Sequence, residues 1–545
     1  MTLYELRPRE DVSMHCRDGT RLDAHVYRPA DAGDFPVLLM RQPYGRSIAS
    51  TVTYAHPSWY ARQGYLVVIQ DVRGRGISEG AFRLLADEVA DGEDTVAWAA
   101  ALPGSSGALG MYGFSYQAMT QYFAAAGGHP ALRTLAPAMG AWDLHHDMAY
   151  EGGSIRLQTG IGWAIQLAVE GARRAGDAAA HRALYAASRA LPLHEAVPSW
   201  PAVLREHERY AHWGDWLRHP DPEDAYWAER SPRHVAAGID LPILHIGGWF
   251  DPMLTGTLAA YRHFAARGKA PQKLMIGPWA HIPWGRRAGQ MDFGPAAARS
   301  MDRLQLRWFD HWLKGLDTGL LDEPPVELFE IGRNAWRGFD RWPAATEACF
   351  LHSDGLAAMD PASGGLAATE RQASGEDVLV LDPWRPFPTT GGHLTHPAGP
   401  ADRAAVEQRS DCLTFTTPPL MTELSLAGDV VAELFAEADH PSFDLACVLS
   451  MVQPDGKVLP LTEGYARIDT PGQKPIRITL RAVAVWLPVG GALRLTVQPC
   501  SFPAHPVNPG TGQQAWETRL IDQRIVTVTL RHGGDTPSRL LLPVL

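Results

Sequence analysis

A strand, a serine and a helix follow one another without a linker in the segment 110–125. Residues 110–114 have the short apolar pattern of a buried strand, and Ser115 stands at its end. A helical pattern starts at once with Tyr116. A serine at such a turn exposes its hydroxyl beside the first free amides of a helix, which suits a nucleophile whose oxyanion needs amide donors. The turn therefore predicts an α/β sheet with a reactive serine at its edge, although Gln117 stands where a strict nucleophile elbow has a small residue.

Strands and helices alternate through this part of the chain. Short continuous apolar runs such as 37–40 and 65–69 are typical of the buried strands of a parallel sheet, whereas 22–27 alternates like a half-buried strand. Helices are expected over 87–101 and 297–314. Further strands are expected at 108–113, 133–137, 241–246 and 273–276. This alternation predicts a doubly wound α/β sheet of the α/β-hydrolase type.

Two other regions differ in character from the sheet. Between about Trp142 and Ala237 strand patterns vanish, and helices are expected over 155–169 and 172–191. An insertion between sheet strands commonly forms a lid over the active site. After about Ala345 short strands alternate with Pro/Gly-rich turns, which is typical of an antiparallel sandwich or jelly roll. We therefore expect an α/β-hydrolase domain over 1–141 and 238–345, a helical cap over 142–237 and a β-sandwich (jelly-roll) domain over 346–545.

Composition excludes several other classes of protein. The 545 residues carry a formal net charge of -11 without any Lys/Arg run, which argues against a nucleic-acid partner. The 5 cysteines are far apart and show no metal-binding spacing, and the adjacent pair His145-His146 does not point together, so we expect no metal and no cofactor. Without a signal-peptide core or a membrane-length apolar run, we expect a cytoplasmic protein with no membrane partner. A homo-oligomer stays open.

Two later strand ends carry the partners that a serine nucleophile requires. One strand runs into Trp249-Phe250-Asp251 and the next into Gly277-Pro278-Trp279-Ala280-His281. A base must take the proton of Ser115, and an acid must orient that base. With 22 histidines in the chain, one histidine at a strand end means little by itself. The order Ser115, Asp251, His281, each at a sheet edge, favours a catalytic triad.

The remaining site candidates are aromatic. The Tyr116 amide is one donor for an oxyanion hole, and the Tyr44 hydroxyl could be the second, although a wedged loop aromatic is an equal alternative for Tyr44. Trp163, Trp249 and Phe250 could line an acyl or aromatic pocket, against the alternative that they belong to the core.

Several segments resemble one family of serine hydrolases, the family that holds cocaine esterase, α-amino-acid ester hydrolases and X-prolyl dipeptidyl peptidases. The similarity covers nearly the whole chain. The segments that carry it are Arg41-Gln42-Pro43-Tyr44-Gly45-Arg46, Asp71-Val72-Arg73-Gly74-Arg75-Gly76-Ile77-Ser78-Glu79-Gly80, Gly113-Phe114-Ser115-Tyr116, the two segments that end in Asp251 and His281, Trp308-Phe309-Asp310-His311-Trp312-Leu313-Lys314-Gly315 and Phe415-Thr416-Thr417-Pro418-Pro419-Leu420.

The resemblance implies a role for each candidate. Ser115 would be the nucleophile, His281 the general base and Asp251 the orienting carboxylate, with the Tyr44 hydroxyl and the Tyr116 amide as the oxyanion hole. It also implies a helical cap and a C-terminal jelly roll. One departure is visible, because Ala118 stands where the family usually has glycine. Ala is still small, so we expect the helix to pack against the strand.

Charged residues in two regions have a functional and a structural interpretation. Those in the loop 71–80 are Asp71, Arg73, Arg75 and Glu79. The arginines could clamp an anion, but glycines at 74, 76 and 80 favour a tightly folded, salt-bridged loop. The acidic residues of the cap are Glu151, Asp221, Glu223 and Asp224. They could hold a substrate ammonium, although a solvated acidic loop is the favoured interpretation.

The function expected from these observations is hydrolysis of a small-molecule carboxylic ester or amide through an acyl-enzyme intermediate. An α-amino-acid ester hydrolase, an acylase or a dipeptidyl peptidase is an alternative within the class. A non-catalytic protein that binds carbohydrate or another ligand through the jelly roll is the alternative of another class.

Overall fold

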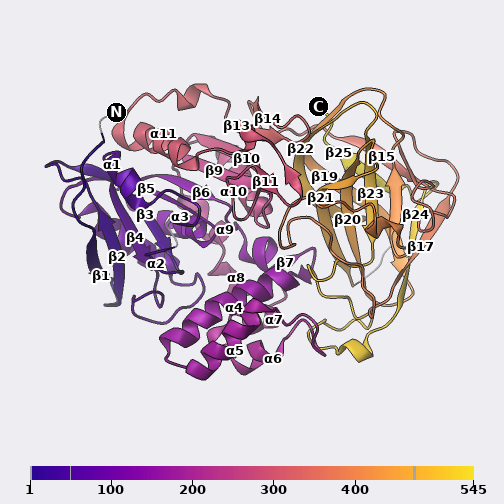
Figure 1. Ribbon diagram of the computed structural model, residues 1–545, viewed down its shortest axis with the longest axis horizontal. Helices are drawn as coiled ribbons and strands as arrows, with labels where there is room; N and C mark the ends of the chain where they lie inside the picture. Colours follow the sequence, from indigo (N-terminus) through magenta and orange to yellow (C-terminus); the bar gives the residue numbers. More distant parts are fainter. Residues whose placement is uncertain (1–2, 49–50, 470–473) are drawn as a thin grey trace.

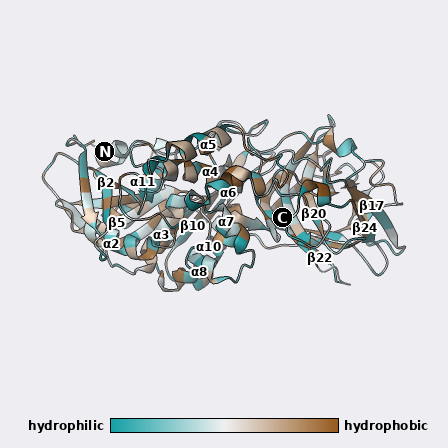
Figure 2. Ribbon diagram, turned by 90° about the horizontal axis from the view of Figure 1, so that it is seen from below, coloured by the Kyte–Doolittle hydropathy of each residue, from teal (hydrophilic) through white to brown (hydrophobic). Residues whose placement is uncertain are grey.

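The computed structural model describes residues 3–48, 51–469 and 474–545. The molecule is elongated, with the N-terminal sheet at one end and a β-rich domain at the other (Figures 1 and 2). The helices that follow residue 142 lie beside the junction of the two (Figure 1).

A mixed sheet of ten strands forms the first domain, in the order β1-β2-β4-β3-β5-β6-β9-β10-β13-β14. Its strands are β1 (Glu10–His15), β2 (Arg21–Tyr27), β3 (Phe35–Gln42), β4 (Leu66–Asp71), β5 (Ser105–Phe114), β6 (Leu132–Ala138), β9 (Ile243–Phe250), β10 (Gln272–Ala280), β13 (Val326–Glu330) and β14 (Ala335–Phe339). From β4 to β13 in this order the strands run parallel, so their carboxyl ends meet at one edge. The α/β-hydrolase sheet is thereby confirmed.

One strand of this sheet differs from the half-buried strand predicted at 22–27. Residues 22–26 of β2 are all buried, because β1 and β4 flank the strand and its polar side chains are paired. Asp23 accepts a 2.7 Å hydrogen bond from Ser13 Oγ, and His25 Nε2 lies 3.0 Å from Asp11 Oδ1. The alternation of apolar and polar residues in β2 therefore reflects paired polar side chains and not a face exposed to solvent.

Helices cover both faces of the sheet. They are α1 (Pro57–Arg62), α2 (Glu88–Ala100), α3 (Tyr116–Ala126), α10 (Leu254–Arg267) and α11 (Met301–Lys314). The predicted helix at 87–101 corresponds to α2. The predicted helix at 297–314 begins later, at Met301, because 295–297 form a separate 3-10 turn and Ala298 is extended.

The region after residue 142 is mainly helical. Its elements are the π-helix His145–Ala149, β7 (Tyr150–Glu151), β8 (Ser154–Ile155), α4 (Leu157–Arg174), α5 (Ala178–Arg189), α6 (Ala202–Glu206), α7 (Trp213–Arg218), α8 (Ala225–Ala228) and α9 (Pro232–Val235). The hairpin of β7 and β8 was not predicted, because it is only two residues long on each side. The helix predicted at 172–191 begins later, at Ala178, as α5. Gly176 has φ +69°, and Asp177 caps the helix by accepting from the Ala180 amide.

The C-terminal domain is a β-sandwich whose strands are almost entirely antiparallel, as predicted. Its strands are β15 (Glu347–His352), β16 (Gly365–Ala367), β17 (Gly375–Leu381), β18 (Leu413–Thr416), β19 (Leu424–Ala438), β20 (Phe443–Val452), β21 (Val458–Ile468), β22 (Ile476–Leu487), β23 (Ala492–Gln498), β24 (Val526–His532) and β25 (Arg539–Leu542). Nine of the ten residues of β20 are buried, so this strand lacks the period-two pattern of a half-buried strand.

The two domains share main-chain hydrogen bonds and a core. The Ile331 amide, just after β13, donates to the Ala484 carbonyl of β22 at 2.9 Å, and the Trp486 amide donates back to Ile331 at 2.8 Å. One hydrophobic cluster includes Trp249 and Phe250 of β9 together with the inner side chains of the sandwich. The C-terminal domain is therefore held at a fixed position against the sheet.

Candidate active site

Ser115 occupies a strained turn between β5 and α3. Its φ is 62° and its ψ is -127°, a combination that L-residues adopt only where the surroundings enforce it. Gly113 makes the turn compatible with the helix, because a Cβ at that position would lie 2.4 Å from the Cβ of Gln117. This strand-to-helix geometry presents the hydroxyl at the edge where the parallel strands end.

The departures from the usual elbow sequence have local explanations. The Gln117 side chain turns back, and its Oε1 accepts a 3.2 Å hydrogen bond from the Phe114 amide, so a bulky residue fits here. Ala118 is fully buried and faces Gly140, where an added Cβ would approach the Ala118 Cβ to 2.7 Å. The glycine on the opposite segment thus makes room for the alanine on the helix.

The three residues predicted at strand ends lie together. Asp251 follows β9 and His281 follows β10, which are adjacent parallel strands. His281 Nδ1 lies 2.7 Å from Asp251 Oδ1, and His281 Nε2 lies 3.1 Å from Ser115 Oγ. Asp251 is 0% exposed, while the His281 side chain is 28% exposed. A buried carboxylate, an imidazole and a serine hydroxyl are therefore connected in series by hydrogen bonds.

Tyr44 and Tyr116 flank the serine hydroxyl. The Trp163 indole nitrogen donates to the Tyr44 hydroxyl at 3.1 Å. Burial raises the pKa of Tyr44, although Trp163, Arg75 and Ser115 oppose the change, so its hydroxyl stays protonated at neutral pH. Tyr116 is the first residue of α3, and its amide has no acceptor within the helix. Both groups can donate a hydrogen bond to an oxygen beside Ser115.

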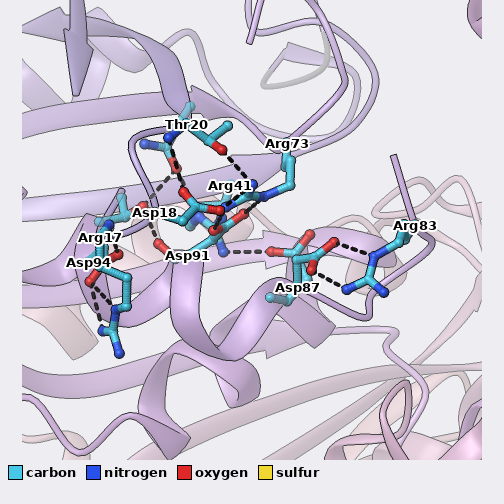
Figure 3. A network of polar contacts seen from close by, with 12 residues as sticks. Arg17, Asp18, Thr20, Arg41, Arg73, Arg83, Asp87, Asp91 and Asp94 are labelled. Carbon is cyan, nitrogen blue, oxygen red and sulfur yellow. Dashed lines mark hydrogen bonds and ion pairs between the residues drawn. The ribbon is translucent and has the colours of Figure 1, made fainter. Parts of the chain in front are cut away.

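Networks of charged residues behind the turn hold Tyr116, α2 and the loop 71–80 in place. The Tyr116 hydroxyl donates to Glu88 at 2.8 Å, and Glu88 pairs with the fully buried Arg41 at 2.6 Å. In the neighbouring loop 71–80, Arg73 pairs with Asp91 of α2 at 2.6 Å and with Asp18 at 2.8 Å (Figure 3).

The second arginine of the loop 71–80 is also committed to internal contacts. Arg75 is buried, donates to the Leu167 carbonyl at 3.0 Å and stacks on the Phe82 ring. Because both arginines contact the protein itself, these contacts fit the structural interpretation of the loop and not an anion clamp.

A cavity of about 1130 Å³ opens onto Ser115 and is shared by three parts of the chain. The sheet and its loops contribute Tyr44, Phe114, Met253 and Ile282. The helical region contributes Met148, Trp163, Gln166 and Leu191, and the C-terminal domain contributes residues 393–398. The contribution of residues 393–398 was not predicted. No local sequence signal marks them, since they reach the cavity only through the docking of the two domains.

The acidic residues considered for an ammonium site do not line this cavity. Glu151 is directed to Arg156 and His393, at 3.2 and 2.9 Å. Within the described part of the chain, Asp147 is the one carboxylate on the cavity wall. Its oxygens accept from the Trp142 and Asp143 amides and from Thr255. Burial raises the pKa of Asp147, and those hydrogen bonds oppose the change.

Two of the three predicted pocket aromatics lie elsewhere. Trp163 lines the cavity, whereas Trp249 and Phe250 are buried in the core between the domains. The Trp249 indole donates to the Phe329 carbonyl at 2.8 Å, and Phe250 stacks on Phe293. The reason is that β9 continues through Phe250, so both side chains pack beside the sheet and not beyond its end.

Neither a metal-binding cluster nor a membrane span is found in the described ranges. There, no group of three or more His, Cys, Asp or Glu side chains is arranged to hold a metal ion. Across those ranges no helix combines the length and the apolar character that a bilayer requires.

Comparisons with known proteins relate nearly the whole chain to one family. Residues 18–283 match the family model of the X-Pro dipeptidyl-peptidase (S15 family), and residues 318–541 match that of the X-Pro dipeptidyl-peptidase C-terminal non-catalytic domain. Cocaine esterase of Rhodococcus sp. (strain MB1 Bresler) is 29% identical over 566 residues, which cover 98% of this chain and 98% of that protein.

Solved structures with the same fold also span the chain. An aminopeptidase from a marine sediment Thaumarchaeota archaeon superposes with a TM-score of 0.82 at 24% identity, over 100% of this chain and 97% of the other. An α-amino acid ester hydrolase superposes with a TM-score of 0.81 at 23% identity, over 99% and 96%. These similarities extend through the sheet, the helical region and the sandwich alike.

Proposed function

Because this chain belongs to the S15 family of X-Pro dipeptidyl-peptidases and related serine hydrolases, which also holds cocaine esterase, we propose that it hydrolyses carboxylic esters through an acyl-enzyme intermediate. The observation that carries the proposal is the hydrogen-bonded series from Asp251 through His281 to Ser115, at 2.7 and 3.1 Å. This series has the order and the geometry that nucleophilic catalysis by serine requires.

In the first half of the reaction Ser115 Oγ attacks the carbonyl carbon of the ester. His281 Nε2 takes the hydroxyl proton, and Asp251 holds the imidazole through Nδ1 and balances its positive charge. The negative charge that develops on the carbonyl oxygen is stabilised by the Tyr44 hydroxyl and the Tyr116 amide. His281 then gives its proton to the leaving alkoxide, which departs as the alcohol and leaves Ser115 acylated.

In the second half a water molecule replaces the alcohol. His281 Nε2 takes a proton from the water, whose oxygen attacks the acyl carbon and forms a second oxyanion in the same site. Collapse of this intermediate breaks the bond to Ser115 Oγ, which regains its proton from His281, and the carboxylic acid is released.

An ester without a free α-ammonium group is favoured over an α-amino-acid ester. Ammonium recognition in a buried site needs a carboxylate that is free to pair with it. Asp147 lines the cavity but already accepts three hydrogen bonds from the protein. Met148, Met253 and Leu394 are among the apolar residues that line the cavity, and such residues suit apolar acyl or alcohol groups.

Replacement of the serine tests the proposal. We expect Ser115→Ala to abolish turnover of p-nitrophenyl acetate while the circular dichroism spectrum and the thermal midpoint stay those of the wild type. Ser188→Ala is the matched control, because Ser188 lines the same cavity and donates to the Tyr185 carbonyl. Wild-type turnover by Ser115→Ala would contradict the assignment of the nucleophile.

A further inference from the structure

One arginine of the C-terminal domain contacts the loop that carries Asp251. Arg481 lies on β22 and is only 4% exposed. Its Nη1 donates to the main-chain carbonyl of Asp251, and its Nη2 donates to the carbonyl of Pro252 at 2.5 Å. A guanidinium presents two donors in a rigid fork, so one side chain can hold two successive carbonyls at once.

The position of this arginine is fixed by the docking of the domains. Three residues after Arg481, the Ala484 carbonyl accepts from the Ile331 amide at the end of β13. The Arg481 carbonyl also accepts a 2.6 Å hydrogen bond from Thr462 Oγ1 of the neighbouring strand β21. The strand that bears the guanidinium is thus attached to the sheet that bears Asp251.

The Asp251 carboxylate depends on its main chain for orientation. Within the ranges that the structure describes, its Oδ2 has no hydrogen-bond partner, and Oδ1 contacts His281. The carboxylate therefore has no side-chain support other than the imidazole that it must orient. Its direction is set by the loop between β9 and α10, whose two carbonyls Arg481 holds.

The helical region holds the same loop from the other side. Arg156 is 1% exposed, and its Nη1 donates to the Pro252 carbonyl at 2.9 Å and to the Asp147 carbonyl at 2.5 Å. The Pro252 carbonyl therefore accepts from arginines of two different parts of the chain. A displacement of either part would be transmitted to Asp251.

Nearby acidic groups stabilise the buried guanidinium groups of Arg156 and Arg481. Glu151 lies 3.2 Å from Arg156, and His393 connects Glu151 with Glu463 at 2.9 and 2.5 Å. Although burial alone would raise them, His393 keeps the pKa values of Glu151 and Glu463 below the usual range, and Arg156 and Arg481 add to the effect on Glu151. Burial lowers the pKa of Arg481 to about 10, against the opposing charges of Glu151, Asp251 and Glu463, so it stays a cation at neutral pH.

We propose that Arg481 is a positioning residue for the Asp251 carboxylate, so that the C-terminal domain sets the geometry of the hydrogen-bonded series to Ser115. The inference rests on the function proposed above. It assigns a contribution to catalysis to a domain whose family description calls it non-catalytic. The arginine touches neither substrate nor the reacting atoms, and its effect passes through the main chain of residues 251–252.

The test compares Arg481→Met and Arg481→Lys with Arg467→Met. Arg467 is a matched control, because its side chain is also buried in the same domain but pairs with Asp444. For each variant, kcat and KM on p-nitrophenyl acetate are measured per active site titrated with a fluorophosphonate, together with the rate constant of the fluorophosphonate reaction.

We expect Arg481→Met to lower kcat per titrated site by about 10- to 100-fold with little change in KM, because a misplaced orienting group costs rate and not binding. The rate constant of fluorophosphonate labelling should fall in parallel. Arg481→Lys can satisfy one of the two carbonyls and should recover part of the loss. Arg467→Met should change the fraction of active protein but not kcat per site.

Wild-type kcat per site in folded Arg481→Met would overturn the inference, as would an equal loss in Arg467→Met. If Arg481→Met does not fold, wild-type kcat per site in Arg481→Lys overturns it in the same way. These outcomes are distinguishable from failure of the proposed function, which would appear in the wild type as absence of fluorophosphonate labelling at Ser115.

Discussion

The Trp163 indole nitrogen donates a 3.1 Å hydrogen bond to the hydroxyl oxygen of Tyr44. An indole N–H is a donor only, so Tyr44 accepts this bond and its own proton remains free to point at another acceptor. Tyr44 comes from the loop after β3 and Trp163 from α4, so the helical region orients a group beside Ser115. In the mechanism proposed here, that acceptor is the oxyanion of the tetrahedral intermediate.

Replacement of Tyr44 by phenylalanine removes one oxyanion donor. Because the negative charge is present in the transition state and absent from the bound ester, we expect kcat to fall by about 100-fold with little change in KM. Steady-state kinetics on p-nitrophenyl acetate measures both constants. An unchanged kcat would remove Tyr44 from the oxyanion hole.

Replacement of Trp163 by phenylalanine keeps an aromatic ring and removes the indole donor. We expect kcat to fall by roughly 3- to 10-fold, the effect of about one hydrogen bond of ordinary strength. In Tyr44→Phe the hydroxyl is already absent, so adding Trp163→Phe should have little further effect on kcat. Additive losses in the double variant would indicate that Trp163 acts by lining the cavity and not through Tyr44.

The charge of the cavity wall predicts discrimination between substrates. A phenylacetate ester and the corresponding phenylglycine ester differ by an α-ammonium group, and the Asp147 carboxylate already accepts three hydrogen bonds from the protein. We expect kcat/KM to be at least about 10-fold lower for the phenylglycine ester, because a buried cation without a partner is costly. Faster hydrolysis of the amino ester would contradict this account of the cavity. Asp147→Asn would then test whether Asp147 binds the ammonium group.

The cluster around Glu151 predicts a dependence of stability on pH. The pKa of Glu151 is lowered by folding, so its contribution is fully present above the ordinary value of 4.5 and is lost as the pH falls through the folded value. Glu151→Gln should lower the free energy of unfolding by about 3 kcal/mol at pH 7, because it removes the buried carboxylate that pairs with Arg156 and His393. Urea unfolding at pH 7, 5 and 4 measures the difference from the wild type.

The same comparison has a matched control and a clear contrary outcome. Glu79→Gln changes an exposed glutamate whose contact with Arg21 is 3.6 Å long, and it should change stability little at any pH. We expect the difference between wild type and Glu151→Gln to shrink below pH 4.5. A difference that grows as the pH falls would contradict the lowered pKa.

The parts of the site that the sequence predicts are those set by local pattern. Ser115, Asp251 and His281 each follow an apolar run, and the carboxyl ends of parallel strands meet at one edge, so their proximity could be anticipated. The sequence left open whether Trp249 and Phe250 line the pocket or belong to the core, because the length of β9 cannot be read from hydrophobicity alone.

The contacts that the sequence does not predict are long-range. Arg481 lies 230 residues from Asp251, and its contact exists because β22 docks beside Ile331. The approach of Trp163 to Tyr44 likewise depends on how the helical region packs over the sheet. Strands such as β20 gave no alternating signal because both of their faces are buried.

The most direct test of the central claim is to map the site of reaction with a fluorophosphonate by mass spectrometry of the digested protein. The proposed mechanism predicts one adduct per chain, on the peptide that contains Ser115, and a strongly reduced labelling rate in His281→Ala. An adduct on Ser188 or on another serine, with Ser115 unmodified in active protein, would contradict it.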